Sequence, residues 1–550
     1  MTLHVDGYMG IKDCAAALRK ARRKYLTRFG RQEDGSILIF SLFLLIMMLM
    51  ISGMAVDLMR VETERARLQS TLDRAVLAGA SLEQTLDSKE VVLDYFEKAG
   101  LGAYISADDV IVTPGDNSKT VTAKAFMSMN TYFMNLLGIT ELAAPAFGEA
   151  EESLSNIEIS LVLDISGSMN WYSSNSGNKK IDDLIDAAQD FVYLMQCNPD
   201  DSTGTAVCTV DPDTVSISVV PYSEQVVVGE DLLQEFNVTN EHTGSSCVDF
   251  ATADFNTTAI STSALLKRSG DIDPWTNYRS SRSSSKYSSD NNKTCKPYSD
   301  REIIPFENSY TDLQTKIGNL SAGGNTSIDL GMKWGAALLD PAFRPVVNNL
   351  ANGGTPAVTS AFEDRPYAWN ARSMQKVIVL MTDGENTAQH MLKPAYRSGL
   401  APIWKDPNNG RLSVLRASTG KYWYPHNATW NDQPYKYNVG QDAVQMTYPE
   451  FWSEYSVDYY EEAFWWLPGV LDVYGYDEKN NRLDAICDAA KADGVEIEIF
   501  TIGFETSSAS SAIMQDCASS DAHHFDVNGL DIANAFTSIA REIHELRLTN

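Results

Sequence analysis

A continuous apolar strand that ends in alternating oxygen-bearing side chains is the feature that most constrains this chain. Residues 158–169 read EISLVLDISGSM, so a run with the composition of a buried strand leads directly into Asp164, Ser166 and Ser168. A carboxylate and two hydroxyls at alternate positions just past the end of such a strand are suited to a hard cation.

Two later strings complete a set of oxygen donors. The string GGNTS contains Thr326 and the string VIVLMTDGEN contains Asp383, each placed where a loop would leave the same edge of a parallel sheet. None of these side chains is a thiol or an imidazole, which favours magnesium or manganese over zinc or copper. The sequence therefore predicts a divalent metal site formed by Asp164, Ser166, Ser168, Thr326 and Asp383.

Beyond residue 150 the chain alternates apolar strands with helices, which predicts an α/β domain. Its sheet is expected to be mostly parallel, with helices on both faces. Ligands bind beyond the carboxyl ends of the strands in such sheets, in agreement with the motif positions. The expected strands are 157–163, 215–221, 376–381, 495–502 and one near 524–527, and the expected helices are 179–197, 310–320, 328–339, 478–493 and 531–546.

Two stretches, residues 223–303 and 385–476, contain more chain than a minimal domain of this type needs, so both are interpreted as insertions. The first includes the Ser-rich string YRSSRSSSKYSSDNN, typical of a solvated loop. Its Arg279, Arg282 and Lys286 could contact an anionic surface, but a flexible tether is the interpretation that we favour.

The second insertion is crowded with tyrosine and tryptophan. Such rings form either a binding platform for sugars or protein, or a small core of the insertion's own, which we favour. Because both insertions leave the sheet near the predicted metal site, they are expected to shape the approach of a ligand.

Residues 36–56 form a run of 21 residues without a charge. As a helix it would be about 30 Å long, which matches the hydrocarbon thickness of a bilayer. The basic flank before it and the acidic residues after it predict a cytoplasmic amino terminus and an outward carboxyl-terminal part. A cleaved signal peptide is the rival interpretation, because residues 53–55 read Gly-Met-Ala. We favour an uncleaved anchor, since the amino-terminal region and the apolar core are both too long for a signal peptide.

The formal net charge of −29 is unevenly distributed. Residues 1–34 contain eight Lys and Arg against four acids, a net +4, so the rest of the chain sums to −33. This balance disfavours nucleic acid as a partner. It serves solubility, or else favours divalent cations or basic partners.

Residues 57–83 contain no proline and place Val61, Leu68, Leu72, Val76 and Gly79 near one helix face. The membrane helix is therefore expected to continue as a stalk, which also offers a surface for self-association. The strings DVIVT and KTVTAKAFM predict a strand pair joined by a turn at residues 114–117. For the apolar stretch 129–148, packing against the stalk is favoured over a partner surface.

Seven cysteines divide into Cys14, on the predicted cytoplasmic side, and six beyond the membrane. An even outer set fits an oxidising compartment, and six cysteines permit fifteen pairings. We favour nearest neighbours, and zinc is disfavoured because the sequence contains no Cys-x-x-Cys pair. The expected disulfides are Cys197 with Cys208, Cys247 with Cys295, and Cys487 with Cys517.

The sequence contains no Gly-x-Ser-x-Gly elbow, no His-Glu-x-x-His helix and no Gly-Lys-Ser or Gly-Lys-Thr loop. We therefore expect a protein that is not an enzyme. A hydrolase that uses the metal to activate water is the rival hypothesis.

Residues 30–150 resemble the amino-terminal module of TadG-type Flp (tight adherence) pilus-assembly proteins. The shared features are a Gly before the apolar segment, Ala-Val-Asp at the membrane exit, and a Leu-Gln-x-x-Leu-Asp-x-Ala pattern from Leu68 to Ala75. In related prepilins a Glu lies five residues after the Gly, whereas here Phe40 follows Gly35 at that distance. The resemblance therefore does not imply processing by a prepilin peptidase.

From about residue 151 the chain resembles a von Willebrand factor type A domain, whose three motifs occur in the same order. In that family an Asp-x-Ser-x-Ser string, a loop Thr and a later Asp form the metal-ion-dependent adhesion site. The resemblance implies these roles for Asp164, Ser166, Ser168, Thr326 and Asp383. It also implies Mg²⁺ or Mn²⁺ with one coordination position left for a partner's carboxylate.

Together these features predict a basic cytoplasmic segment (1–34), a transmembrane helix (35–56), a pilin-like stalk module (57–150) and a von Willebrand factor type A domain with two insertions (151–550). The implied function is assembly or anchoring of Flp pili at a bacterial inner membrane, with the carboxyl-terminal domain in the periplasm. The implied partners are other pilus-assembly proteins or pilins that present an acidic side chain. Two alternatives are a surface adhesin for host or environmental ligands, and an accessory subunit that presents a partner to an AAA-type ATPase.

Overall fold

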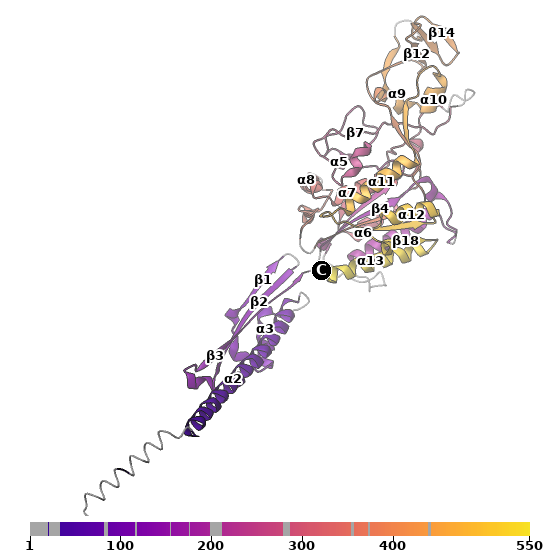
Figure 1. Ribbon diagram of the computed structural model, residues 1–550. Helices are drawn as coiled ribbons and strands as arrows, with labels where there is room; N and C mark the ends of the chain where they lie inside the picture. Colours follow the sequence, from indigo (N-terminus) through magenta and orange to yellow (C-terminus); the bar gives the residue numbers. More distant parts are fainter. Residues whose placement is uncertain are drawn as a thin grey trace, which may run out of the picture. The chain divides into compact units, whose positions relative to one another are not determined.

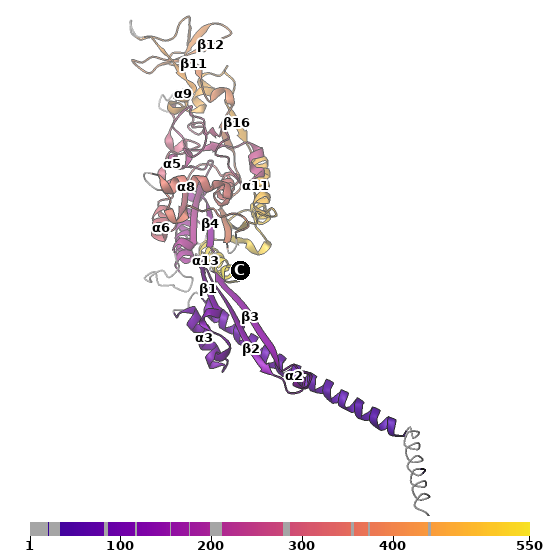
Figure 2. The ribbon, with the colours of Figure 1, turned by 90° about the vertical axis from the view of Figure 1, so that its left-hand side faces the viewer.

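The computed structural model describes residue 20 and residues 34–81, 86–115, 118–153, 156–174, 176–197, 212–278, 286–353, 357–371, 374–437 and 442–549. The chain divides into two compact units, Met1–Ser153 and Leu154–Asn550, and Figures 1 and 2 show both. Several residues on which these predictions depend lie outside the described residues. They are Cys14 and Cys208, Arg19, Arg22, Arg23, Lys24, Arg28 and Arg31 of the basic flank, Asp116 and Asn117 of the predicted turn, and Arg279 and Arg282 of the Ser-rich string.

The first unit is built on one long helix, α2 (Asp34–Ala80, 47 residues). Its segment from Ile37 is long and apolar enough to cross a membrane. The predicted continuation into a stalk is confirmed, because the same helix runs on past the apolar run without a break. Val61, Leu68, Leu72 and Val76 are buried on one face, as the three- and four-residue spacing predicts.

A three-stranded antiparallel sheet packs against this helical face. It has the order β1 (Val110–Gly115), β2 (Ser118–Asn130) and β3 (Glu141–Ser153), with α3 (Ser88–Lys98) alongside α2. The predicted strand pair is confirmed, and β3 adds a third strand that the sequence analysis did not identify. Ala144 and Ala146 of β3 are buried, so the expected packing of the stretch 129–148 holds there. It does not hold for the β2–β3 connection, where Tyr132 and Leu136 are exposed.

The second unit contains the predicted α/β sheet, in the order β18-β17-β9-β4-β5-β8. The first five strands are mutually parallel, and β8 closes one edge in the antiparallel direction. All five predicted strands are confirmed, whereas the short edge strand β8 was not predicted. The bounds are β4 Asn156–Asp164, β5 Val215–Tyr222, β8 Ile304–Glu307, β9 Met374–Thr382, β17 Glu498–Phe504 and β18 His524–Val527.

Helices cover both faces of this sheet, and the two cores that they form are separate (Figure 1). One core contains residues of α4 (Lys180–Gln196), α6 (Tyr310–Gly318) and α13 (Asp531–Thr549). The other contains residues of α7 (Ile328–Leu339), α8 (Arg344–Asn352), α11 (Tyr476–Lys491) and α12 (Ser508–Cys517). The five predicted helices are confirmed, and α8 and α12 are additional.

Close packing of α7 on the sheet depends on two glycines one helical turn apart. A Cβ atom on Gly331 would lie 2.6 Å from Tyr222 Cδ1, and one on Gly335 would lie 2.6 Å from Val162 Cγ2. Neither distance is compatible with a side chain, so these positions set how near α7 lies to β4 and β5.

The first insertion extends the α7 side of the core rather than standing apart from it. Phe236 and Phe250 pack against Trp334 with ring centroids 6.0 and 5.9 Å apart. Its regular elements are short: α5 (Glu230–Leu233), β6 (Val248–Asp249) and β7 (Lys267–Arg268). At the described end of the Ser-rich string, Tyr287 is 48% exposed and stacks on Tyr455 of the second insertion.

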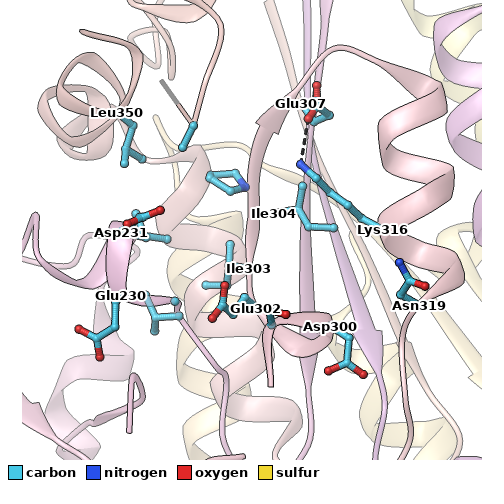
Figure 3. A pocket seen from close by; sticks show the side chains of 16 residues that line it. Glu230, Asp231, Asp300, Glu302, Ile303, Ile304, Glu307, Lys316, Asn319 and Leu350 are labelled. Carbon is cyan, nitrogen blue, oxygen red and sulfur yellow. Dashed lines mark hydrogen bonds and ion pairs between the residues drawn. The ribbon is translucent and has the colours of Figure 1, made fainter. Parts of the chain in front are cut away.

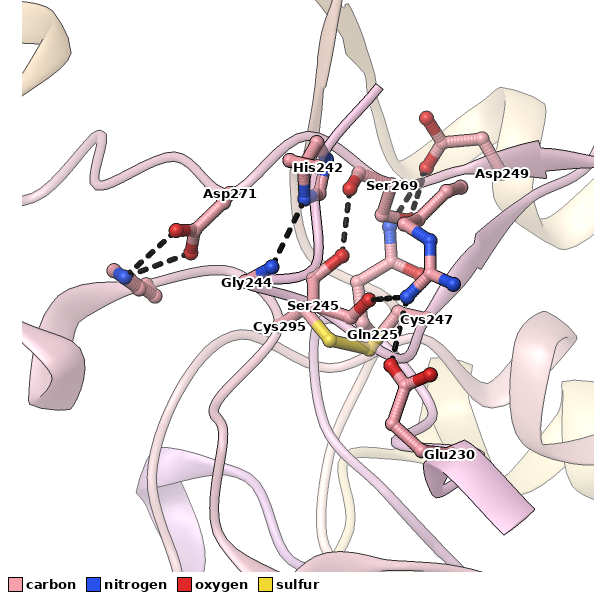
Figure 4. Close-up of a disulfide and its surroundings, with 12 residues drawn as sticks. Gln225, Glu230, His242, Gly244, Ser245, Cys247, Asp249, Ser269, Asp271 and Cys295 are labelled. Atoms are coloured by element: carbon pink, nitrogen blue, oxygen red, sulfur yellow. Dashed lines mark hydrogen bonds and ion pairs between the residues drawn. A yellow bond between two sulfur atoms is a disulfide. The ribbon is translucent and has the colours of Figure 1, made fainter. Parts of the chain in front are cut away.

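A disulfide between Cys247 and Cys295 closes this insertion, and Figure 4 shows its surroundings. Close by, Lys293 forms an ion pair with Asp271 at 2.8 Å, and Ser245 Oγ donates to the carbonyl of Ser269 at 2.7 Å. A second disulfide joins Cys487 on α11 to Cys517 at the end of α12. Cys197 is also disulfide-bonded, while Cys208, its predicted partner, lies outside the described residues.

The second insertion forms a lobe with its own core, as the favoured interpretation of its aromatic residues predicts. An antiparallel sheet in the order β14-β13-β12-β11-β15 packs with α9 (Tyr448–Glu454) and α10 (Val457–Ala463). Buried rings include Phe451, Trp452 and Tyr460. The strands are β10 Gln389–Leu392, β11 Leu400–Lys405, β12 Leu412–Arg416, β13 Lys421–Tyr424, β14 Thr429–Asn431, β15 Val444–Thr447 and β16 Leu471–Tyr474, with β10 and β16 paired at its base.

We expect Gly335→Ala to destabilise the protein even though alanine is the better helix former by about 1 kcal/mol. The added methyl group would overlap Val162, so the free energy of unfolding should fall by about 1–2 kcal/mol net. Chemical denaturation of the full chain in detergent measures the change. Gly469→Ala is the control, because Gly469 is exposed and a Cβ atom there meets only the carboxylate end of Glu461, at 3.4 Å. Equal stability of the two variants would contradict the packing argument.

Candidate metal centre

The topology of the sheet brings two of the predicted ligands to one point. β4 lies at the centre of the sheet, with β5 and β8 on one side and β9, β17 and β18 on the other. The order of the strands therefore reverses between β4 and β9, which is where ligands bind in open α/β sheets. Leu163 pairs with Met381 in parallel register, so Asp164 and Asp383 emerge side by side at the carboxyl ends of the two strands.

Hydrogen bonds join four of the five predicted residues. Ser166 Oγ lies 3.0 Å from Ser168 Oγ, and Ser168 Oγ donates to Asp383 Oδ1 at 2.6 Å. The backbone N–H of Ser166 donates to Asp164 Oδ1 at 2.8 Å. The other oxygen of Asp164 accepts a hydrogen bond of 2.8 Å from the Thr382 hydroxyl. The two carboxylates and the two serines thus form one group connected by hydrogen bonds, with Asp164 joined through the backbone N–H of Ser166.

The loop that contains Thr326 is held against this group by backbone hydrogen bonds. Gly167 N donates to Gly324 O, and Gly323 N donates to Ile165 O, each at 2.8 Å. Gly323 and Gly324 have φ angles of +155° and +101°, values that favour glycine. A buried arginine, Arg301, reinforces the contact, because its Nη2 donates to Ile165 O and Gly323 O at 2.9 Å each.

Thr326 itself is buried, and hydrogen bonds from α11 and from the loop after β9 hold its backbone in place. Lys479 Nζ donates to Thr326 O and to Ser327 Oγ, and Thr326 N donates to Thr387 Oγ1 at 2.8 Å. Within the described part of the chain, no hydrogen bond joins the Thr326 hydroxyl to the other four residues. The structure thus places Thr326 in the adjoining loop and does not connect its side chain to the group.

The electrostatics of the two carboxylates follow from their burial. Asp164 is fully buried. Removal from water, and secondly the charge of Asp383, raise the pKa of Asp164 to about 7. Burial also raises the pKa of Asp383, although hydrogen bonds from Ser168 and the ammonium group of Lys180 act in the opposite direction. Two buried carboxylates therefore lie close together, and the positive charge beside them is too small to stabilise both in the ionised form.

Lys180 partly compensates the negative charge of these carboxylates. Its Nζ lies 3.2 Å from Asp383 Oδ2 and 3.7 Å from Glu505 Oε2. Lys180 is the first residue of α4, where the helix dipole disfavours a cation. The two carboxylates outweigh that unfavourable position.

The residues present fit a hard divalent cation. Every candidate ligand is an oxygen, and the two carboxylates gain an ionised partner when a cation binds between them. In the described residues, no cluster of three or more His, Cys, Asp or Glu side chains could hold a metal. That finding is compatible with this site, because only two of its five members are carboxylates. Asp164, Ser166, Ser168, Asp383 and, from the adjoining loop, Thr326 are the residues that would hold the ion.

Sequence reasoning missed several residues that organise the site. Thr382 could have been noticed, because it directly precedes Asp383 in the same string. Lys180, Arg301, Lys479 and Glu505 carry no local signal, since each reaches the site from another element.

A cavity of about 990 Å³ lies elsewhere in the second unit, between the first insertion and β8 (Figure 3). Its lining is acidic and includes an ion pair of 3.1 Å between Lys316 and Glu307. Burial, and then the charges of Asp231 and Glu230, raise the pKa of Glu302 there. None of the five predicted metal residues lines this cavity.

The first unit contains a segment that is similar to a known protein family. Residues 35–82 match the family model Tad, described as Flp pilus-assembly TadE/G-like. The chain carries a TadE/G-like Flp pilus-assembly domain at its amino-terminal end. The matched residues thus include the apolar segment and the whole stalk part of α2. The likeness to Flp pilus-assembly proteins inferred from the sequence is confirmed. No curated protein has a significantly similar sequence.

Several of the similar solved structures are pilus proteins. The von Willebrand factor domain of the type V pili tip protein Mfa5 from Porphyromonas gingivalis is 15% identical, with a TM-score of 0.31, and the match covers 72% of this chain and 98% of that one. The pilus adhesin SpaC from Lactobacillus rhamnosus GG is 12% identical, with a TM-score of 0.27, over 80% of this chain and 34% of that one. The PilB minor pilin from Streptococcus sanguinis is 11% identical, with a TM-score of 0.28, over 80% and 77%. TM-scores this low do not support any inference about the site from these structures.

We expect Lys180→Met to tighten the binding of Mn²⁺ by about tenfold, because it removes a positive charge that repels the ion. Without metal the same variant should be less stable than the parent, since Asp383 loses a buried partner. Isothermal titration with Mn²⁺ and thermal melting with and without the ion measure both effects. Lys179→Met is the matched control, because it changes the same charge at the next residue, whose Nζ instead contacts Asn170. Weaker Mn²⁺ binding by Lys180→Met would show that the ammonium group does not compete with the ion.

Proposed function

We propose that this chain is a membrane-anchored, pilus-associated protein that binds a partner's carboxylate through a divalent ion held at the ends of β4 and β9. The observation that carries the proposal is the convergence of Asp164, Ser166, Ser168 and Asp383 at the point where the strand order reverses. The TadE/G-like domain supports the association with Flp pili.

The site is suited to binding rather than to turnover. When bound, Mg²⁺ or Mn²⁺ would supply a positive centre that accepts one further oxygen ligand. The chain's own residues orient that centre, because the Ser166–Ser168–Asp383 hydrogen bonds fix three donors relative to one another. An acidic side chain from a pilin or another assembly protein would provide the oxygen that the chain does not. We assign no catalytic step to these residues.

The proposed location follows from charge and from the disulfides. The basic residues before α2 favour a cytoplasmic amino terminus, so the second unit would lie on the outer face of a bacterial inner membrane. Two disulfides in that unit, Cys247–Cys295 and Cys487–Cys517, suit an oxidising compartment such as the periplasm. The exposed face of the stalk helix provides a surface for self-association.

We infer that the two insertions would shape what reaches the site. Both meet at Glu224, which accepts from the backbone N–H of His390 at 2.8 Å and from Trp275 Nε1 at 3.3 Å. The carbonyl of the same Glu224 accepts from Ser327 Oγ, next to Thr326. A partner that presents a carboxylate to the ion would therefore also contact the insertions, which would give selectivity.

We expect the full chain in detergent to bind Mn²⁺ at one site with an exchangeable position. Addition of acetate should displace bound water and lower the enhancement of water proton relaxation. Asp164→Ala should abolish Mn²⁺ binding, because it removes one of two carboxylates, whereas Asp472→Ala, an exposed carboxylate on β16, should bind as the parent does. Mn²⁺ binding by Asp164→Ala at parental affinity would refute the metal site.

Capture of pilus components tests the partner. We expect the full chain to retain the pilin and assembly proteins of its own pilus system in Mg²⁺ and to release them when a chelator is added. Asp164→Ala should fail to retain the same proteins in Mg²⁺, and Asp472→Ala should retain them. Mass spectrometry of the bound fractions gives the comparison. Retention that is indifferent both to the chelator and to Asp164→Ala would exclude the metal-dependent contact while leaving metal binding itself untouched.

A further inference from the structure

The connection between β2 and β3 is an exposed apolar loop in an otherwise acidic protein. Residues 131–140 read TYFMNLLGIT and contain no charged side chain. Tyr132 is 68% exposed, Leu136 78%, Leu137 49% and Ile139 41%. Such a cluster on the surface of a soluble part of a protein normally marks a contact with another apolar body.

The loop is fixed to α2 at the point where the apolar run ends. Asp57, the first charged residue after that run, is 1% exposed. Its carboxylate accepts backbone hydrogen bonds from Tyr132 at 3.1 Å, Phe133 at 2.7 Å and Met134 at 2.8 Å. A carboxylate that receives three N–H donors is compatible with a place that water reaches poorly.

The loop also lies against the apolar run itself. The ring of Phe133 fills the space beside Gly53, where a Cβ atom would be 2.4 Å from Phe133 Cδ1. Gly53 precedes Asp57 by four residues, which is about 6 Å along a helix. Figure 2 shows the neighbouring ends of β2 and β3 beside α2. The loop therefore lies at the depth of the last turn of the uncharged segment.

Side chains around the loop have the distribution found at a membrane interface. The guanidinium carbon of Arg60 lies 4.2 Å from the centre of the Tyr132 ring. On α2 itself Val56, Leu58 and Met59 are exposed around the same level. Aromatic rings and an arginine beside an apolar span are typical of the headgroup region of a bilayer.

We propose that the loop 131–140 inserts into the leaflet from which α2 emerges, and that it forms a second membrane contact beside the transmembrane helix. The occupant of the apolar surface is lipid, because the surface is continuous with the segment of α2 that crosses the bilayer and is fixed to it through Asp57 and Gly53. This inference rests on the membrane anchor of the proposed function and not on the metal site. Its consequence is that the stalk cannot rotate or tilt freely at the membrane, since two points of the first unit are held there.

A nitroxide spin label tests this placement in the full chain, with Cys14 replaced by Ser and the chain reconstituted in vesicles of phosphatidylethanolamine and phosphatidylglycerol. The label is attached at Leu136→Cys in the loop, at Ile111→Cys on β1, or at Phe43→Cys in the apolar run. All three side chains are exposed, at 78%, 56% and 57%. Power saturation compares collisions with oxygen, which partitions into lipid, and with a water-soluble nickel chelate.

We expect the ratio of oxygen to nickel accessibility at position 136 to exceed that at 111 by about fivefold and to approach that at 43. A label at 136 that meets the nickel chelate as often as the label at 111 would place the loop in water and overturn the proposal. A label shielded from both reagents would show that protein, such as a second copy, covers the loop, and would also overturn it. If the label at 43 is not in lipid, the anchor itself fails, which separates the two failures.

Discussion

Parallel pairing of β4 with β9 is the constraint on which the candidate site depends. The register that joins Leu163 to Met381 leaves Asp164 and Asp383 at neighbouring strand ends, although they are far apart in the sequence. Both carboxylates are buried, with Asp164 0% and Asp383 5% exposed. Burial and the proximity of the two carboxylates are therefore consequences of one arrangement. Burial raises the pKa of both groups, and the charge of Asp383 raises the pKa of Asp164 further.

Buried cations hold the loops around that point. Lys479 and Arg482 of α11 lie 3.9 Å from the two oxygens of Asp329, and Lys479 also bonds the loop that contains Thr326. Lys376 pairs with Glu158 at the opposite end of the same strands. Burying such pairs contributes little net stability, because desolvation offsets their attraction. We infer that their role is positional, because each cation contacts elements that are distant from it in the sequence.

The same use of a buried charge recurs in the first unit. Asp57 binds three consecutive backbone N–H groups of the β2–β3 connection, and so couples the hairpin to the helix at one depth. The ring of Phe133 packs against Gly53 of the helix in the same contact. The two units thus share a principle: a carboxylate at the end of an apolar segment finds its partners in a loop that is distant in the sequence.

The sequence alone determined the parallel sheet, the helix that continues from the apolar run into the stalk, and the identities of five oxygen-bearing side chains. These follow from the spacing of apolar residues, the length of the apolar segments and the chemistry of the side chains, all of which are local properties of the sequence. Only the tertiary structure decided that Lys180, Thr382 and Arg301 lie beside those side chains or the loops that carry them. It also decided that, within the described residues, the hydroxyl of Thr326 forms no hydrogen bond with the other four. In the first unit, it decided that Tyr132 and Leu136 are exposed. The reason is that each of these facts depends on which elements pack together, and an ammonium group or an aromatic ring carries no local mark of the partner it will meet in the folded chain.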